Sequence, residues 1–486
     1  MTDPALTQID EALARGATRK RRQPVRPLTM IQPLEAHTDD ASVDAGRPAL
    51  LDRDVWPQIF FAIQFLWGIP LFLPDTQGIR FIVRALPYAS GMLFLLLYFR
   101  RAPHGRLPRG GALVVAALLL LVLNLMHPTS ALTAGVAQCV FQLSIAAPVF
   151  WLHKTVRSSV QLTRVLYIIF ILNFLSAGLG MLQVYYPDRF MPPQFSAQLA
   201  DDFLGSMTYV GADGRVITRP PGLTDTPGGA SVAGGIAALL GFGLTLRTRN
   251  LWHALAIALM SAVSLASVYL TQARSVPLIA IGAAVVIGVI TIRQGRIARA
   301  SWGLGAAGAV IVASFLWASA LGGASVEERF LTLRDQGALA SYQQNRGDFL
   351  ASTLGELLDQ YPLGAGLGRW GMMETYFADG SNPAATHIHV EIQPTGWLLD
   401  GGIPMWFLYG GAIILSLFAS LGLSFTRNML LAECAPLVLG LQLFIAGMSM
   451  AGPAFNMQLG ILFWAVAAAV HGAAEGDRRA EMEAGA

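Results

Sequence analysis

The sequence predicts an all-α protein that crosses a membrane about twelve times. Of its 486 residues, 54% are hydrophobic and only 13% are charged, and the mean hydropathy is +0.52. These values lie outside the range of soluble domains of this size. Crossing about 30 Å of hydrocarbon takes roughly 20 apolar residues in a helix, which satisfies its own backbone hydrogen bonds. Twelve stretches meet this requirement: residues 55–73, 83–99, 111–127, 131–152, 165–186, 229–246, 251–270, 276–292, 301–321, 397–425, 429–449 and 454–472.

The basic residues predict how these stretches are oriented, because short loops rich in Lys and Arg stay on the cytoplasmic side. Lys and Arg lie before the first stretch and close to the end of each even-numbered one. They are Arg19, Lys20, Arg21, Arg22, Arg26, Arg100, Arg101, Arg106, Arg109, Lys154, Arg157, Arg164, Arg247, Arg249, Arg293, Arg296, Arg299, Arg427, Arg478 and Arg479. Both termini are therefore expected in the cytoplasm.

The segments outside the twelve stretches exclude several classes of protein. Residues 1–54 are polar with no long apolar run, which predicts a mostly disordered tail and not a cleaved signal peptide; residues 473–486 form a second tail. The net charge of +3 is spread over separate segments, so nucleic acid is not expected as a partner. Cys139 and Cys434 both fall inside expected helices, which disfavours a disulfide framework or a thiolate zinc site. No Walker A motif is present.

Two segments on the expected outer side, residues 187–228 and 322–396, are much longer than a turn requires. Long loops in compact proteins tend to be functional, whereas the cytoplasmic loops are short and basic. Function is therefore expected on the outer side of the membrane domain, which covers residues 55–472.

The second long loop is expected to contain a helix that lies on the membrane domain. Helical spacing gives it one apolar stripe, shared by Arg346, Leu350, Leu354, Leu357 and Leu358. Pro362 should end this helix, and the glycine-rich turn that follows surrounds Arg369 and Trp370. Its backbone N–H groups are candidates to bind an anion.

Arginine dominates the charge on the expected outer side, although the positive-inside bias disfavours it there. These residues are Arg80, Arg84, Arg189, Arg215, Arg219, Arg274, Arg329, Arg334, Arg346 and Arg369. The planar guanidinium binds phosphate oxygens in pairs and keeps its proton, so such a cluster suits the diphosphate of a polyprenyl carrier. Arg274 and Arg346 are the first candidates, and the prolines of segment 219–229 place Arg219 at the membrane edge. The alternatives are a helix-end anchor for Arg274 and a solvated loop charge for Arg346.

His387 and His389 lie just ahead of the tenth stretch, with Glu391 close by. A neutral imidazole can accept the proton of a sugar hydroxyl that attacks an anomeric carbon, or can orient that hydroxyl. Glu391 is the competing base, and either histidine could instead be satisfied by loop backbone. Metal binding is disfavoured because the pattern lacks a third ligand, so no metal or cofactor is expected.

Taken together, these residues resemble the O-antigen ligase and O-antigen polymerase superfamily over roughly residues 160–470. The likeness is carried by RPPGLTDTP (219–227), TQARS (271–275), NRGDF (345–349), PLGAGLG (362–368) and THIHVE (386–391). The histidine departs from the family pattern, since Val390 follows His389 where the family commonly has Asn. Gly401 and Gly402 lie twelve and thirteen residues after His389, close to the family's spacing, so His389 is favoured over His387.

The resemblance implies a GT-C-like helical fold in a bacterial inner membrane, with a large helical periplasmic loop between helices nine and ten. It implies that Arg274 and Arg346 contact the diphosphate of an undecaprenyl-diphosphate-linked glycan and that the loop histidine sits at the reacting centre. It also implies a glycosyltransferase that inverts the anomeric carbon without a metal. Arg219 and Arg369 are expected to add to the diphosphate site.

The favoured function is a polymerase that joins lipid-linked repeat units into exopolysaccharide or O-antigen. RPPGLTDTP and PLGAGLGRWG look more like exopolysaccharide polymerases than lipid A core ligases. Arg80 and Arg84, one helical turn apart, could serve a second carrier, although a ligase could use the same pair to bind a phosphorylated core sugar. The alternative is an O-antigen ligase that transfers the glycan to lipid A core. A transporter is the third class considered, but the internal repeats expected of one are missing. The expected partners are the lipid-linked glycan, the bilayer, and a chain-length regulator or flippase.

Overall fold

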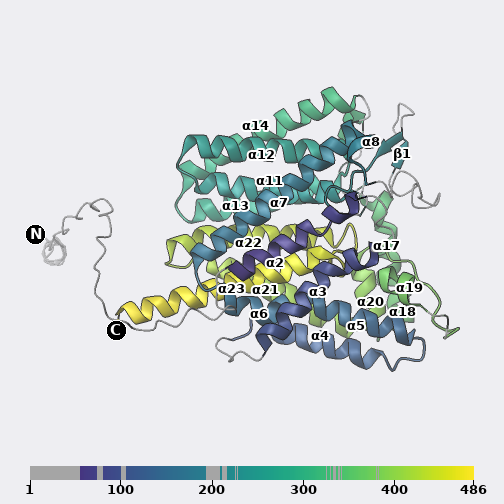
Figure 1. Cartoon of the computed structure of the whole chain (residues 1–486). Helices are drawn as coiled ribbons and strands as arrows, with labels where there is room; N and C mark the ends of the chain where they lie inside the picture. The colour runs from purple at the N-terminus through teal and green to yellow at the C-terminus, as the bar shows by residue number, and fades with distance from the viewer. Residues whose placement is uncertain are drawn as a thin grey trace, which may run out of the picture. The chain divides into compact units, whose positions relative to one another are not determined.

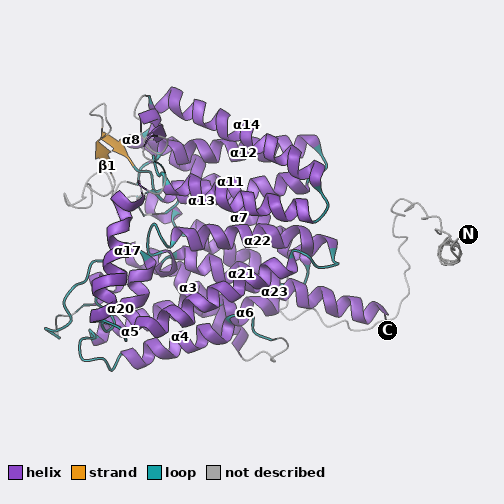
Figure 2. Cartoon of the chain, turned by 180° about the vertical axis from the view of Figure 1, so that it is seen from behind, coloured by secondary structure: helices purple, strands orange, loops and turns teal. Residues whose placement is uncertain are grey.

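The computed structural model describes most of the chain beyond residue 54. The described residues are 55–73, 80–99, 106–192, 208–210, 216–224, 226, 228–323, 326–328, 330–331, 335, 337, 340, 342–378, 380 and 382–485. The segment 1–54, expected to be a disordered tail, lies outside them. Over the described part, regular structure is helical apart from one hairpin of two short strands (Figure 2).

In this described part, ten helical segments are long and apolar enough to cross a membrane. They are α2 with η2 (Val55–Leu66, Ile69–Phe72), α5 with α6 (Leu132–Ala146, Pro148–Thr155), α7 (Ser159–Tyr185), α11 (Gly229–Arg247), α12 (Leu251–Leu270), α13 (Ser275–Arg293), α14 (Ile297–Gly322), α20 with η6 and α21 (Gln393–Met405, Trp406–Gly410, Gly411–Leu423), α22 (Met429–Met448) and α23 (Gln458–Gly485). Each coincides with an expected stretch, which confirms a multi-pass, all-α architecture.

The other two expected stretches are also helical, as α3 (Arg80–Phe99) and α4 (Gly111–Asn124), but their apolar parts are shorter. α4 ends three residues before the expected boundary. The hydroxyl of Ser130 donates to the carbonyl oxygen of Asn124 (2.8 Å), which satisfies one of the carbonyl groups left free at the helix end. The total of twelve crossings therefore stays a prediction.

α11 lies inside the bundle, where it contacts α7, α12, α13, α14 and α22 (Figure 1). Lipid tails are as apolar as core side chains, so helices in membranes associate through close packing, which small residues permit. A Cβ atom at Gly234 would lie 2.5 Å from the backbone oxygen of Ser264, and one at Gly241 would lie 2.0 Å from Oγ of Ser261. The glycines of α11 thus allow its close approach to α12.

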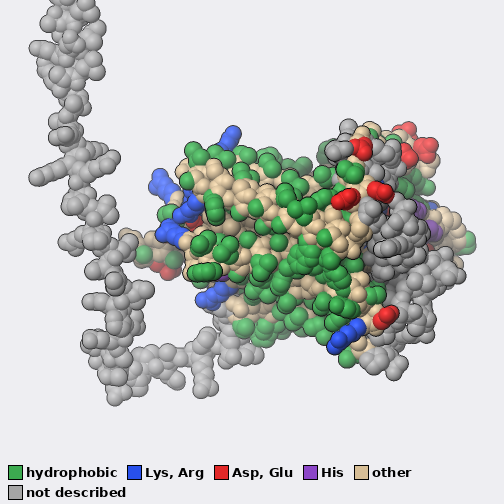
Figure 3. Space-filling view, turned by 90° about the horizontal axis from the view of Figure 1, so that it is seen from above, with side chains coloured by type: hydrophobic (Ala, Val, Ile, Leu, Met, Phe, Trp, Pro, Cys, Tyr) green, Lys and Arg blue, Asp and Glu red, His purple; other side chains and the backbone are tan. Residues whose placement is uncertain are grey.

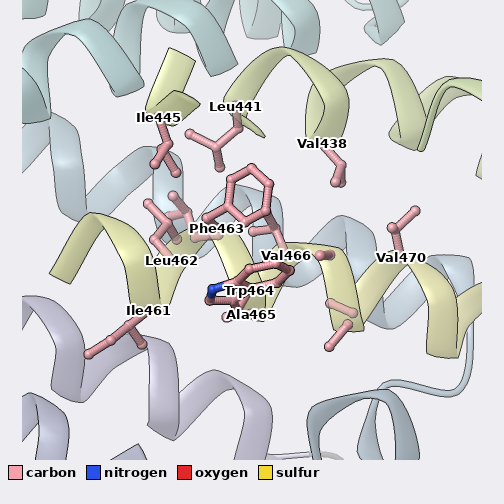
Figure 4. Close-up of a cluster of buried hydrophobic side chains, with 14 of the residues drawn as sticks. Val438, Leu441, Ile445, Ile461, Leu462, Phe463, Trp464, Ala465, Val466 and Val470 are labelled. Atoms are coloured by element: carbon pink, nitrogen blue, oxygen red, sulfur yellow. The ribbon is translucent and has the colours of Figure 1, made fainter. Parts of the chain in front are cut away.

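A second packed region joins α22 to α23 (Figure 4). Leu441 and Ile445 of α22 belong to the same buried cluster as Phe463 and Trp464 of α23, and the indole N–H of Trp464 donates to the hydroxyl of Tyr409 (2.9 Å). α23 then continues as a helix to Gly485, so residues 473–485 of the expected tail extend the last membrane helix.

The two ends of the membrane domain differ in the charge of their side chains: Lys and Arg gather at one end, whereas most of the visible Asp and Glu lie toward the other (Figure 3). The basic end holds the ends of α11 and α13, and Arg247, Arg293, Arg296 and Arg299 lie there. The opposite end, called the loop end here, carries α8 (Pro187–Phe190), the antiparallel strands β1 (Thr208–Val210) and β2 (Val216–Thr218), and α19 (Gly371–Phe377). The described parts of the two long loops therefore share one end of the bundle, as the alternation of basic segments predicts.

The loop helix of the second long loop is present and packs on α20. It runs without interruption through η4 (Gln343–Gly347), α17 (Asp348–Ser352), η5 (Thr353–Leu357) and α18 (Leu358–Gln360), and it ends before Pro362 as expected. The predicted apolar face is wrong at one position, because Leu354 is 51% exposed. The neighbouring Thr353 is buried instead, and its hydroxyl forms a hydrogen bond with that of Thr395 (2.6 Å). η4 and η5 are π-helical turns, each of which adds residues to a turn and rotates the stripe away from regular helical spacing.

Candidate functional site

Arg346, Glu391 and His389 form a cluster of contacting side chains at the loop end. The Nη1 atom of Arg346 contacts Oε2 of Glu391, and Nε2 of His389 lies 3.0 Å from Oε1 of the same carboxylate. The side chains of Arg346 and Glu391 are about one-third exposed, at 33% and 30%, and that of His389 is 65% exposed. One carboxylate therefore holds an arginine and a histidine side by side, within reach of solvent.

The local sequence explains why His389 faces outward. Residues 386–391 have no helical structure, and Ile388 and Val390 pack against a buried group that includes Trp370. The backbone N–H of Ile388 also donates to the carbonyl oxygen of Arg369 (2.9 Å). His387 and His389, which alternate with these two residues, are exposed, the pattern that side chains follow when successive residues point to opposite sides.

The two histidines have different partners. His389 belongs to the Arg346 cluster, whereas Nδ1 of His387 lies 3.3 Å from Oε2 of Glu374 in α19. His389 thus shares a carboxylate with Arg346, whereas His387 has a carboxylate of α19 as its partner. This difference distinguishes two residues that the sequence pattern left as alternatives.

Arg219 acts electrostatically on Arg346. Burial lowers the pKa of Arg346 below its usual value; Tyr342 opposes this shift, and the positive charge of Arg219 adds to it. Arg219 opens the segment that leads into α11, where the N–H of Ala230 donates to the carbonyl oxygen of Pro220 (3.2 Å). Because the positive charges of Arg219 and Arg346 repel each other, an anion bound beside both would be stabilised.

Arg274 lies at the junction of α12 and α13, where it is the N-cap residue of α13. Val276, two residues on, faces Gly235 near the start of α11, which places the junction at the loop end. Gln272 has a φ of 55°, a left-handed conformation that is uncommon for residues other than glycine. The structure thus puts half-buried Arg274 at the end of the bundle that also carries Arg346.

Arg84 lines the larger of the described cavities, about 440 Å³ in volume. The wall is mainly apolar and aromatic, and it comes from α2, α3, α5, α7, α11, α19 and α23 together with residues 223, 224 and 226. Nη1 of Arg84 donates to the hydroxyl of Tyr376, another wall residue. Arg346, His387, His389 and Glu391 are not among the wall residues. The side chain of Arg80 lies outside the described part of the chain.

Arg369 holds the glycine-rich turn in place. Arg369 is buried, with only 5% of its surface exposed. It donates to the backbone oxygens of Thr386 (3.0 Å) and Ala365 (2.6 Å) and to the hydroxyls of Thr386 (3.0 Å) and Thr129 (3.3 Å). A guanidinium whose donors are used in this way positions the loop, so we leave Arg369 out of the diphosphate site proposed below.

Several backbone N–H groups of the turn, expected as candidates to bind an anion, are already used in hydrogen bonds to the membrane domain. The N–H groups of Ala365, Leu367 and Gly368 donate to Leu399, to Ser130 and to Gln138, respectively, at 2.7–2.9 Å. Gly368 has a φ of 74°, and a Cβ atom there would lie 2.6 Å from that of Ala134. Glycine is needed for close packing on α5.

Asp400 in α20 is a buried carboxylate that the sequence reasoning missed. It is 1% exposed, and its Oδ1 accepts hydrogen bonds from Gln138 and from the indole of Trp370, both at 2.7 Å. Its Oδ2 has no hydrogen-bond partner among the described residues. An acidic residue inside an otherwise apolar stretch was the available signal. Gln138 and Trp370 also line the cavity, so Asp400 fixes part of its wall.

Among the residues described, no three His, Cys, Asp or Glu side chains form a group that could hold a metal ion. In the comparisons with known proteins, no family model and no curated protein matches this chain. The function proposed for this chain therefore depends on the arrangement of the side chains and on the resemblance of its sequence motifs.

Proposed function

We propose that this protein is a membrane glycosyltransferase that polymerises undecaprenyl-diphosphate-linked repeat units at the periplasmic face of a bacterial inner membrane. The observation that carries the proposal is the carboxylate of Glu391, held between Arg346 and His389. A glycosyl transfer from a diphosphate carrier needs a cation for the leaving group beside a base for the acceptor hydroxyl. Both kinds of side chain meet around this one anion.

In the proposed mechanism, the diphosphate replaces Glu391 as the partner of Arg346. Arg219 and Arg274, on the same end of the bundle, add positive charge. As the bond between the anomeric carbon and the diphosphate oxygen breaks, the electron pair stays on that oxygen, and the arginines stabilise the added negative charge. No metal is required for this step in the proposal, because guanidinium groups carry out the charge stabilisation.

His389 accepts the proton of the attacking hydroxyl as that oxygen bonds to the opposite face of the anomeric carbon, which inverts its configuration. Nε2 of His389 faces Glu391, so Nδ1 is the nitrogen left to receive the proton. The carboxylate then stabilises the imidazolium that forms. Direct proton transfer to Glu391 is the competing mechanism.

The cavity lined by Arg84 supports the polymerase over the ligase. A polymerase binds two glycans on lipid carriers, so it needs a second site that is apolar for the prenyl chain and cationic for the phosphate. The cavity offers a mainly apolar wall and one arginine. The fold proposed for this arrangement is GT-C-like.

Activity of arginine variants tests the proposal. With purified protein and a lipid-linked repeat unit, we expect Arg346→Ala and Arg274→Ala to reduce turnover by about a hundredfold, the usual effect of losing one donor to a developing oxyanion. Lys should restore only part of it, because it keeps the charge and loses the paired donors. Arg189→Ala is the matched control, since Arg189 is an exposed arginine at the same end. Full activity in Arg346→Ala at normal protein level would remove that residue from the mechanism.

The glycan profile of a deletion strain separates polymerase from ligase. Loss of a polymerase should leave single repeat units on the carrier and abolish long secreted or capsular polysaccharide. Long chains that accumulate on the carrier while lipid A core stays unsubstituted would instead identify a ligase.

A further inference from the structure

Three arginine side chains converge on one glutamate at the basic end of the bundle. Nη1 of Arg296 lies 2.8 Å from Oε1 of Glu433, and Nη1 of Arg299 lies 3.6 Å from the same oxygen. Nε of Arg247 lies 3.6 Å from Oε2. The group joins the end of α11, the start of α14 and the first turns of α22, and its one carboxylate neutralises only one of three positive charges.

The hydrogen-bonding groups of this arginine cluster are not all used. The side chain of Arg247 is 13% exposed, and its Nη2 donates to the hydroxyl of Thr163 (3.3 Å). Its Nε and Nη1 are buried and have no acceptor within hydrogen-bond distance among the described residues, and the nearest carboxylate oxygen to Nε is that of Glu433 at 3.6 Å. Buried donors without acceptors are unfavourable. Arg296 and Arg299 are 20% and 37% exposed, so the cluster is open to an anion from outside.

A narrow apolar groove starts next to the cluster. It is a cavity of about 70 Å³ between α11, α12, α13 and α14, with an almost wholly apolar lining. Its lining includes Thr245, two residues before Arg247, and Gly303, four residues after Arg299. From Ala258 to Tyr269, the α12 part of the lining covers about 16 Å along the helix axis. The groove therefore leads from the arginine cluster into the membrane-spanning part of the bundle.

We propose that the arginine cluster and this groove bind an anionic phospholipid of the bilayer. The phosphate contacts Arg296 and Arg299 in competition with Glu433, next to the positive charge of Arg247, and the first carbons of one acyl chain lie in the groove. Basic pockets between membrane helices are a recognised way to bind anionic lipid headgroups, and arginine suits phosphate because it donates in pairs. The site lies at the end of α11 opposite to segment 219–229, so it goes beyond the glycosyltransferase function proposed above and does not depend on it.

Lipid retention by the purified full-length protein tests this site. Protein in detergent is exchanged against phosphatidylglycerol or phosphatidylcholine, and bound lipid is measured by native mass spectrometry. We expect Arg296→Gln with Arg299→Gln to reduce phosphatidylglycerol binding by roughly tenfold or more. Arg249→Gln with Arg427→Gln is the matched control, because it removes two exposed arginines at the basic end. Glu433→Gln removes the competing anion and should increase phosphatidylglycerol binding.

Equal loss of binding in the two double variants would overturn the proposal, because general surface charge would then explain the preference. Equal retention of phosphatidylcholine by the unmodified protein would overturn it as well. Ala307→Phe, which narrows the groove and keeps every arginine, should lower phosphatidylglycerol binding too. If this variant binds normally, or if inorganic phosphate stabilises the protein as much as the lipid does, the groove takes no part in binding.

Discussion

Replacing Glu391 by Gln removes the carboxylate that Arg346 and His389 share while it keeps the shape of the side chain. In the proposed mechanism this carboxylate occupies the place that the diphosphate takes on Arg346. The variant should therefore bind the lipid-linked donor more tightly than the unmodified protein. It should also react more slowly, because His389 loses the group that orients it.

The exposure of the pair sets the magnitude of this effect. The side chains of Arg346 and Glu391 are 33% and 30% exposed, so water screens their attraction, and ion pairs of this kind contribute about 0–1 kcal/mol. Loss of the competitor should thus lower the dissociation constant of the donor by up to about fivefold, since about 1.4 kcal/mol corresponds to a factor of ten. The free energy of unfolding should change by less than about 1 kcal/mol.

Titration of purified protein with a fluorescent polyprenyl-diphosphate glycan gives the dissociation constant, and single-turnover kinetics give the rate of transfer. Glu374→Gln is the matched control, because Glu374 pairs with His387 at 3.3 Å and its replacement removes the same charge from the same end. Donor binding by Glu391→Gln that is no tighter than by this control would refute the idea of a displaced carboxylate. A loss of turnover beyond a hundredfold would identify Glu391 as the base itself.

Three further predictions concern stability, topology and metals. Asp400→Ala leaves the donors of Trp370 and Gln138 buried and unpaired. Because each unpaired donor costs about 1–3 kcal/mol, the free energy of unfolding measured in detergent should fall by about 2–6 kcal/mol, and Asp400→Asn should lower it by less. Cysteines placed at exposed Ala384 and Ala480 should react with a membrane-impermeant reagent only at Ala384 in intact cells, and the reverse pattern would invert the orientation. Excess chelator should leave transfer by purified protein unchanged, and activity restored by Mg²⁺ or Mn²⁺ would contradict this.

The helices could be predicted from sequence because the physical constraint on them is local. A segment in hydrocarbon must satisfy its own backbone hydrogen bonds, so a run of apolar residues is enough to define a membrane helix. α12 matches its expected range, and α13 and α22 match theirs within a residue. α14 begins at Ile297, four residues before its expected stretch, because the helix continues through basic residues that hydropathy alone excludes.

The features that the sequence did not predict depend on contacts between distant segments. Burial of Asp400 needs Gln138, more than 200 residues away in the chain. Leu354 was expected on the apolar face because regular helical spacing was assumed, and the π-helical turns of the loop helix changed which side chains pack on α20. The donors of Arg369 are used by Thr129 and Thr386. Each of these outcomes depends on which segments pack together.

The choice between His387 and His389 shows how the two kinds of information combine. Alternation along extended backbone is local, and it places both histidines on the same side, away from the buried group that includes Trp370. What separates them is the loop helix, which brings Arg346 to Glu391 beside His389, while α19 brings Glu374 to His387. A base for this reaction has to lie beside the cation that stabilises the leaving group, since proton transfer and bond cleavage occur at the same anomeric carbon. His389 meets that condition through the carboxylate that it shares with Arg346, so the position of a helix that starts more than forty residues earlier decides which histidine the proposed mechanism uses.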